Sequence, residues 1–150
     1  NWLWFLWWTG ASNKDAANVC AEDIDWKKGI VKFHRSKTGT KVTVGIGESL
    51  ATLLKKLPKK GFLFPCLQAR TTDNRGRVFN VMVDWCGLEK VTIHGYRFGW
   101  AERAKEGGMS TEDRMAALGH QSVQMATHYD EKGDYIPASI EIIDGGLKAA

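Results

Sequence analysis

The sequence predicts an α+β fold, mostly helical, with a small antiparallel β-sheet or hairpin near the N-terminal third. Residues 41–46 alternate strictly, which places Val42, Val44 and Ile46 on one face of a strand. Other segments carry apolar residues at helical spacing, the clearest set being Leu50, Leu53, Leu54 and Leu57. With 150 residues, the chain is long enough for one domain with a substantial core and too short for two.

The composition is that of a soluble globular protein. A net charge of +4 and a pI near 9.0 are compatible with binding to nucleic acid, but many other proteins are this basic. Three cysteines without a C-x-x-C pair argue against a disulfide framework and a structural zinc site, and they fit a reducing cytoplasm. We therefore expect a cytoplasmic protein without a metal site.

The apolar run at residues 2–8 opens the chain. It is too short to span a bilayer and lacks a preceding basic region, so it predicts neither a membrane segment nor a signal peptide. Because the chain begins inside this run, we expect it to be part of a longer protein. Periodicity does not distinguish a buried helix from a buried strand here.

A short helix and a hairpin are expected next. Residues 13–19 favour a helix with Ser12 or Asn13 as its N-cap, which places Asp15 in the first turn, where the helix dipole favours a carboxylate. From residue 21 to residue 46 the pattern indicates strands.

The hairpin joins a β-rich segment at residues 30–35 to the alternating strand at residues 41–46. Residues 36–40 (Ser-Lys-Thr-Gly-Thr) supply turn chemistry between them. Lys37 is therefore expected at the tip, free to reach outward.

The middle of the chain predicts a helix at residues 49–57, ended by Pro58, and an extended apolar piece at residues 61–65. Residues 68–77 are polar and are expected to form a loop. A helix over residues 78–87 would place four apolar side chains on one face, namely Val78, Val81, Met82 and Trp85.

The last third predicts successive helices. One runs from residue 94 to residue 106 and is closed by two glycines, and a second begins at the capping signature of residues 110–113 and stops at Gly119. Ser122 can cap a third helix that carries Tyr129. Beyond a polar break, apolar residues at helical spacing follow, namely Ile136, Ile140 and Ile143.

Four side chains in this region suit phosphoryl transfer. Arg97 can hold a phosphate by two parallel hydrogen bonds, and His94 can exchange a proton near neutral pH. His120 can donate to a phosphate oxygen, and the Tyr129 hydroxyl is a nucleophile once cations or a base activate it. Each alone has a simpler explanation: neighbouring surface residues, a histidine at a helix end, or a tyrosine packed in the core.

Taken together, the order H-x-x-R, L-G-H-x-S and Y resembles the catalytic domain of the tyrosine recombinase (phage integrase) family. Further matches lie upstream, at Thr9-Gly10, Asp23-Ile24-Asp25 and Lys37-Thr38-Gly39. The similarity extends from about the first residue to Tyr129.

The resemblance implies that Tyr129 attacks a DNA phosphodiester, forms a 3′-phosphotyrosyl link and releases a 5′-hydroxyl. It implies that Arg97 and His120 stabilise the transition state, that His94 moves the tyrosine proton, and that Lys37 protonates the leaving oxygen. No metal, cofactor or ATP is expected.

One departure concerns the family's first box, which reads T-G-x-R-x-x-E. Here Ser12 stands in place of the arginine and Asp15 in place of the glutamate. Loss of one phosphate-clamping arginine would cost on the order of 2–4 kcal/mol of transition-state stabilisation, by analogy with an oxyanion donor. Either the enzyme is impaired or another cation, such as Lys14 or Arg35, compensates, and a Ser12→Arg substitution would distinguish these outcomes.

The resemblance also implies partners. Double-stranded DNA is the expected one, with backbone contacts from Lys14, Arg35, Arg70, Arg75 and Arg77. We expect a monomer when free, a tetramer on DNA, a bacterial or phage origin, and no membrane association. Because the chain starts at the first box, we expect it to lack the N-terminal domain common in this family. The tail at residues 130–150 is expected either to be exchanged with a neighbouring protomer or to fold back on its own core.

Three other interpretations remain open. Ser12 is compatible with a catalytically silent DNA-binding relative, and a type IB topoisomerase would use the same chemistry. A mixed α/β domain with chance motifs predicts that His94, Arg97, His120 and Tyr129 do not converge on one basic pocket.

Overall fold

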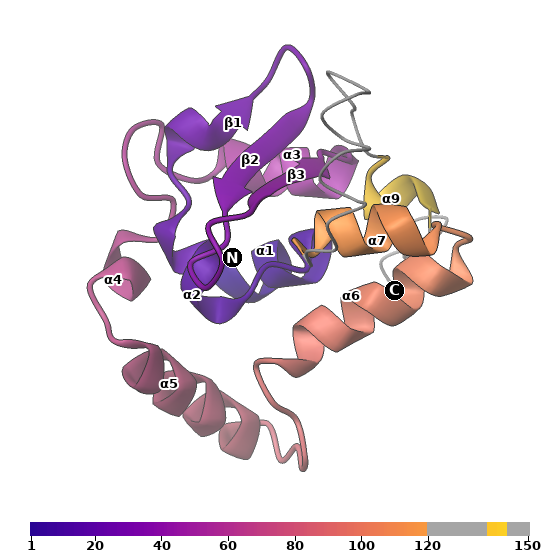
Figure 1. The fold of residues 1–150 in the computed structure, drawn as a ribbon. Helices are drawn as coiled ribbons and strands as arrows, with labels where there is room; N and C mark the ends of the chain where they lie inside the picture. Colours follow the sequence, from indigo (N-terminus) through magenta and orange to yellow (C-terminus); the bar gives the residue numbers. More distant parts are fainter. Residues whose placement is uncertain (120–137, 144–150) are drawn as a thin grey trace.

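The computed structural model describes residues 1–119 and 138–143. Within them, a three-stranded antiparallel sheet lies on one side of helix α1 (Trp2–Thr9) and helix α6 (Gly95–Glu106) lies on the other (Figure 1). Helix α1 packs against both α6 and α3 (Glu48–Lys55). The predicted α+β class, mostly helical with a small antiparallel sheet, is confirmed.

The apolar run at the start of the chain is helical. Phe5 and Leu6 are fully buried, whereas the side chain of Trp4 is 57% exposed. Helix α1 ends at Gly10, whose φ of 64° lies in the left-handed region that glycine tolerates. A Cβ at Gly10 would also lie 2.9 Å from the ring of Trp100 in α6. This glycine therefore allows the end of α1 to approach α6 closely.

Helix α2 (Asn13–Asn18) has the predicted N-cap. The backbone N–H of Asp15 donates to Oγ of Ser12 over 3.2 Å. This bond satisfies one of the amides left unpaired at a helix start. Asp15 itself is buried.

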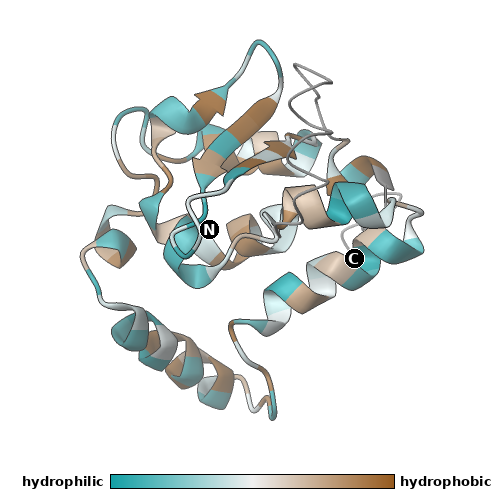
Figure 2. Cartoon of the chain, viewed as in Figure 1, coloured by the Kyte–Doolittle hydropathy of each residue, from teal (hydrophilic) through white to brown (hydrophobic). Residues whose placement is uncertain are grey.

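The sheet consists of β1 (Ile24–Asp25), β2 (Ile30–His34) and β3 (Lys41–Gly45), in the order β1-β2-β3. A single 3-10 turn, η1 (Ala21–Asp23), leads into β1. In the β2–β3 hairpin Val31 pairs with Val44. Both strands carry hydrophobic residues among more polar ones (Figure 2). The predicted hairpin is confirmed. Its alternation holds from residue 41 to residue 44, with Val42 and Val44 buried and Lys41 exposed, whereas Gly45 is buried and β3 ends there.

The prediction for residues 68–77 was wrong. They were expected to form a loop, but α4 (Pro65–Gln68) ends there and α5 (Thr72–Trp85) begins at residue 72. Thr71 is the reason: its hydroxyl accepts from the N–H of Asn74, so a polar segment starts a helix. The buried residues of α5 are Arg75 and Phe79.

The apolar face predicted for this helix is largely exposed. Val81 is 66% and Trp85 is 88% exposed. Helix α5 contacts α2 and lies at the edge of the fold, and it carries hydrophobic residues along its length (Figure 2).

The C-terminal helices begin and end where the capping signals indicated. Helix α6 ends at Gly107, and α7 (Thr111–Ala117) starts after Ser110, whose Oγ accepts from the N–H of Asp113 over 3.0 Å. Helix α9 (Ile140–Ile143) packs against α1 and α6. The helix expected to carry Tyr129 lies outside the described residues. Among the helices that are described, none has the length and apolar character needed to cross a membrane.

Candidate active site

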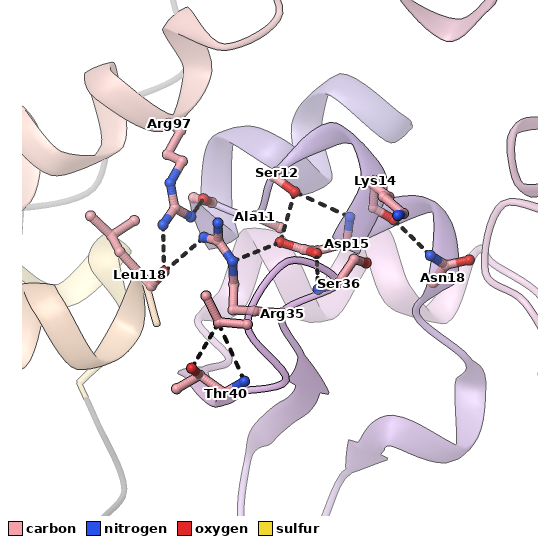
Figure 3. A network of polar contacts seen from close by, with 12 residues as sticks. Ala11, Ser12, Lys14, Asp15, Asn18, Arg35, Ser36, Thr40, Arg97 and Leu118 are labelled. Carbon is pink, nitrogen blue, oxygen red and sulfur yellow. Dashed lines mark hydrogen bonds and ion pairs between the residues drawn. The ribbon is translucent and has the colours of Figure 1, made fainter. Parts of the chain in front are cut away.

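A buried carboxylate ties α2 to the β2–β3 turn. Asp15 is 2% exposed, and its Oδ1 accepts from the backbone N–H of Ser36 over 2.7 Å. Its Oδ2 accepts from Oγ of Ser12 over 2.7 Å and forms an ion pair with Nε of Arg35 at 3.1 Å (Figure 3). Both carboxylate oxygens are therefore engaged, and the base of the turn is fixed against α2.

Arg35 connects this carboxylate to the end of α7. It follows β2 directly, and its backbone N–H donates to the carbonyl of Thr40 across the turn over 2.8 Å. Its Nη1 donates to the carbonyl oxygen of Leu118, also over 2.8 Å. A Cβ at Gly119 would lie 2.6 Å from Cγ of Arg35, and the φ of Gly119 is 60°. Glycine at this position therefore leaves room for the Arg35 side chain.

Arg97 reaches the same carbonyl from α6. Its Nη1 donates to the carbonyl of Gly10 over 2.8 Å, and its Nη2 donates to the carbonyl of Leu118. The side chain is buried, and the pKa of Arg97 is lowered to about 10. Burial is the larger cause and the charge of Arg35 the second, whereas Asp15 opposes the change. Two guanidinium groups thus converge on one carbonyl oxygen (Figure 3).

The other predicted catalytic residues lie around this cluster or beyond the described chain. His94 stands at the N-cap position of α6 without a side-chain capping hydrogen bond. It is exposed, with its ring 5.0 Å from the ring of Phe98 in edge-on contact. Lys37 is exposed in the β2–β3 turn, as the sequence predicted. His120 and Tyr129 lie outside the described residues, although His120 follows Gly119 directly in the sequence.

The five arginines and lysines expected to contact DNA have different environments. Lys14, Arg70 and Arg77 are exposed, and Arg35 is half-buried in the cluster described above. Arg75 is 5% exposed, and burial lowers its pKa. Its position does not fit the expected direct contact with DNA.

Arg75 holds α5 against its neighbours. Its Nε donates to Oδ1 of Asn13 and its Nη1 to the carbonyl of Leu67, each over 2.8 Å. The carbonyl of Arg70 and, at 3.1 Å, the hydroxyl of Thr72 accept further hydrogen bonds. Sequence reasoning missed this role because the acceptors are backbone carbonyls and a distant asparagine.

Sequence reasoning also missed the carbonyl of Leu118 as the meeting point of two arginines. The sequence holds only an indirect indication of this contact: Arg35 follows a strand that ends at a turn, and Gly119 follows a capped helix. Among residues 1–119 and 138–143, no three His, Cys, Asp or Glu side chains gather in a group able to hold a metal.

The fold is shared with solved structures of integrases. The integrase from mycobacterium phage Brujita has a TM-score of 0.67 at 14% identity, over 87% of this chain and 47% of that one. The transposon Tn1549 integrase, in complex with transposon right end DNA, has a TM-score of 0.70 at 14% identity, over 84% and 52%. A lambda integrase dimer bound to a COC′ core site has a TM-score of 0.65 at 20% identity, over 89% and 53%.

The chain spans about half the length of these proteins. At these identities the likeness shows the fold alone. The model of the phage integrase family matches residues 3–134, so the chain belongs to this family. No curated protein sequence matches the chain, and nothing in these comparisons favours a topoisomerase.

Proposed function

We propose that this chain is the catalytic domain of a site-specific DNA recombinase that cuts and rejoins strands through a phosphotyrosyl intermediate on Tyr129. The observation that carries the proposal is the buried Arg97 at the carbonyl of Leu118, two residues before His120. Arg97 is held by acceptors from two other elements, so its orientation is fixed before substrate binds. Preorganised donors of this kind stabilise developing negative charge effectively.

Each step of the reaction exchanges one phosphoester bond for another. The Tyr129 oxygen attacks the scissile phosphorus, the bond to the 5′-oxygen breaks, and Lys37 gives that oxygen a proton. His94 accepts the tyrosine proton, and Arg97 and His120 hydrogen-bond to the phosphate oxygens. Attack by the 5′-hydroxyl of another strand reverses these steps and releases Tyr129, so the chemistry itself requires no ATP.

DNA is the partner that this chemistry requires. Lys14, Arg70 and Arg77 are exposed and can contact phosphates of the backbone. We expect the whole protein to act in the cytoplasm and to assemble on double-stranded DNA as a tetramer, because two strand exchanges need four nucleophiles. Tn1549 integrase and lambda integrase have been solved bound to DNA, which supports DNA as the partner here.

Covalent trapping tests the proposal without knowledge of the target site. The full-length protein that carries this chain would be mixed with nicked duplexes randomised around the nick. In such substrates the short cleaved fragment diffuses away and the adduct accumulates. Protein-linked DNA would be isolated under denaturing conditions and sequenced to define a preferred site.

We expect an adduct from the wild type and from Tyr135→Phe, and none from Tyr129→Phe. Binding of the selected or random duplexes without an adduct would contradict the proposal. That result would favour the catalytically silent DNA-binding relative that Ser12 suggests.

A further inference from the structure

We propose that Arg35 is a second arginine that contacts the scissile phosphate. It would replace the arginine that the family's first box carries at the position of Ser12. This inference rests on the proposed function. It concerns the residue at the end of β2, for which the family's motif gives no role in this chain.

The shared acceptor places Arg35 within reach of any phosphate that Arg97 holds. Nη1 of Arg35 and Nη2 of Arg97 both donate to the carbonyl oxygen of Leu118. The two guanidinium groups therefore border one point, although their backbones come from β2 and α6. A phosphate oxygen next to that point can accept from both.

The orientation of Arg35 is fixed by contacts on two of its three nitrogens. Nε pairs with Asp15, and Nη1 donates to Leu118. Nη2 has no partner within residues 1–119 and 138–143, which leaves a donor for a phosphate oxygen. The planar guanidinium cannot turn without breaking both existing contacts, so this donor is preorganised.

Ser12 and Asp15 are positioning residues in this scheme. The Ser12 hydroxyl donates to Oδ2 of Asp15, the oxygen that pairs with Arg35. Ser12, which stands in place of the first-box arginine, therefore helps to orient Arg35 through the carboxylate of Asp15.

The net positive charge of the cluster also favours binding of an anion. Arg35 and Arg97 carry two positive charges, and Asp15 carries one negative charge. Asp15 is 2% exposed, and the side chain of Arg35 is only 14% exposed, so water screens these charges poorly. The mutual repulsion of the arginines, which also lowers the pKa of Arg97, is relieved when a phosphate binds.

A purely structural role for Arg35, as partner of Asp15 and Leu118, is the alternative to exclude. Changing the charge of the scissile phosphate separates the two roles. A methylphosphonate at that position carries no negative charge, so its cleavage depends less on a neutralising cation. A defect of folding or loop position would persist on both substrates.

The experiment uses the full-length protein and the nicked duplex that the wild type selects, made with either phosphate or methylphosphonate at the scissile position. Release of the labelled 5′-hydroxyl strand is timed for wild type, Arg35→Met, Arg35→Lys and Lys27→Met. Lys27 is the control cation, exposed in the turn at the opposite end of β2. Thermal unfolding and DNA affinity are measured in parallel.

On the phosphate substrate we expect Arg35→Met to slow release by about 10²–10³-fold, the range typical for loss of an oxyanion donor. On methylphosphonate we expect its deficit to shrink at least about tenfold. Arg35→Lys keeps the charge opposite Asp15 but lacks the fork of donors, so it should be intermediate and folded. Lys27→Met should match the wild type, and Ser12→Arg should give no gain, because the second arginine is already present.

The inference is overturned if Arg35→Met and Arg35→Lys cleave phosphate DNA at the wild-type rate. It is also overturned if the Arg35→Lys deficit is equal on both substrates, or if Ser12→Arg alone speeds the wild type tenfold or more. Wild-type protein that binds DNA without releasing any strand would instead refute the proposed function, and this inference with it.

Discussion

Asp15 is the residue on which the polar cluster depends. It is buried, and it accepts hydrogen bonds from two elements besides pairing with Arg35. Ser12 as N-cap and Asp15 in the first turn were predictable, because both follow from local helix chemistry. The ion pair with Arg35 was not, since it spans 20 residues of sequence and depends on how the hairpin folds back.

We predict that Asp15→Asn lowers the free energy of unfolding by about 2–3 kcal/mol. Removing one partner of a buried pair costs roughly 3–5 kcal/mol, and the partial exposure of Arg35 reduces that figure. Urea denaturation gives the measurement, with Asp84→Asn as a matched control on the exposed end of α5. The control should change stability by less than about 0.5 kcal/mol. Equal effects of the two substitutions would contradict the structural role of Asp15.

The two arginines should also be coupled in their titration. Arg97 has a pKa of about 10, lowered first by burial and then by the charge of Arg35. Removal of a neighbouring positive charge favours the protonated form, so Arg35→Met should raise the pKa of Arg97 towards its ordinary value. Titration of the arginine ¹³Cζ resonances by NMR gives the measurement. An unchanged or lower pKa would mean that the guanidinium groups do not face one another.

At the scale of elements, the bounds of helices and strands were predicted most accurately where the sequence has a helix cap or a strict alternation. Helices α6 and α7 and the β2–β3 hairpin begin and end close to their predicted residues. The first part of helix α5, residues 72–77, was not predicted to be helical because it is polar. The residue that anchors it is Arg75, and arginine is a residue type usually found at the surface. No periodic pattern signals an arginine that is buried against backbone carbonyls.

Arg75 and Arg77 offer a matched pair on α5. We predict that Arg75→Ala loosens α5, because it leaves the carbonyl of Leu67 and the side chain of Asn13 without their donor. Arg77 is exposed, so Arg77→Ala should leave the helix intact and weaken DNA binding. Amide hydrogen exchange over residues 72–85 and DNA affinity distinguish the two effects. Loss of DNA affinity in Arg75→Ala with unchanged exchange would restore the direct contact predicted from sequence.

At the scale of the whole molecule, the end of the described chain packs on its own core. Ile140 is 1% exposed, and the carboxylate of Glu141 accepts from the backbone N–H groups of Ser49 and Leu50, over 2.7 and 2.8 Å, at the start of α3. Residues 138–143 therefore pack against α1, α3 and α6 of this chain. Exchange of the tail at residues 130–150 with a neighbouring protomer stays a prediction.

We predict that Glu141→Gln lowers stability by about 1 kcal/mol. The substitution removes a negative charge from a helix N-terminus, where carboxylates are favoured, and weakens two charge-assisted hydrogen bonds. Thermal unfolding gives the measurement, with Glu106→Gln at the exposed end of α6 as control. A Glu141→Gln protein as stable as the control would show that this contact does not hold the tail in solution.

The overall fold could be predicted because helix periodicity, hairpin chemistry and spaced motifs agreed with one another. The candidate site could be predicted in part. Arg97 and Lys37 were expected from the motifs, whereas the meeting of Arg35 and Arg97 depends on the Leu118 carbonyl, which no side-chain pattern encodes.

Identification of the tyrosine that becomes linked to DNA tests the central claim most directly. Trypsin cleaves after Arg114 and Lys132, so Tyr129 is the one tyrosine of the peptide 115–132, and Tyr135 falls in the next peptide. After nuclease trimming of the trapped adduct, mass spectrometry should find the nucleotide on Tyr129. A nucleotide on Tyr135, on Tyr96 or on a residue other than tyrosine would contradict the assignment of the nucleophile.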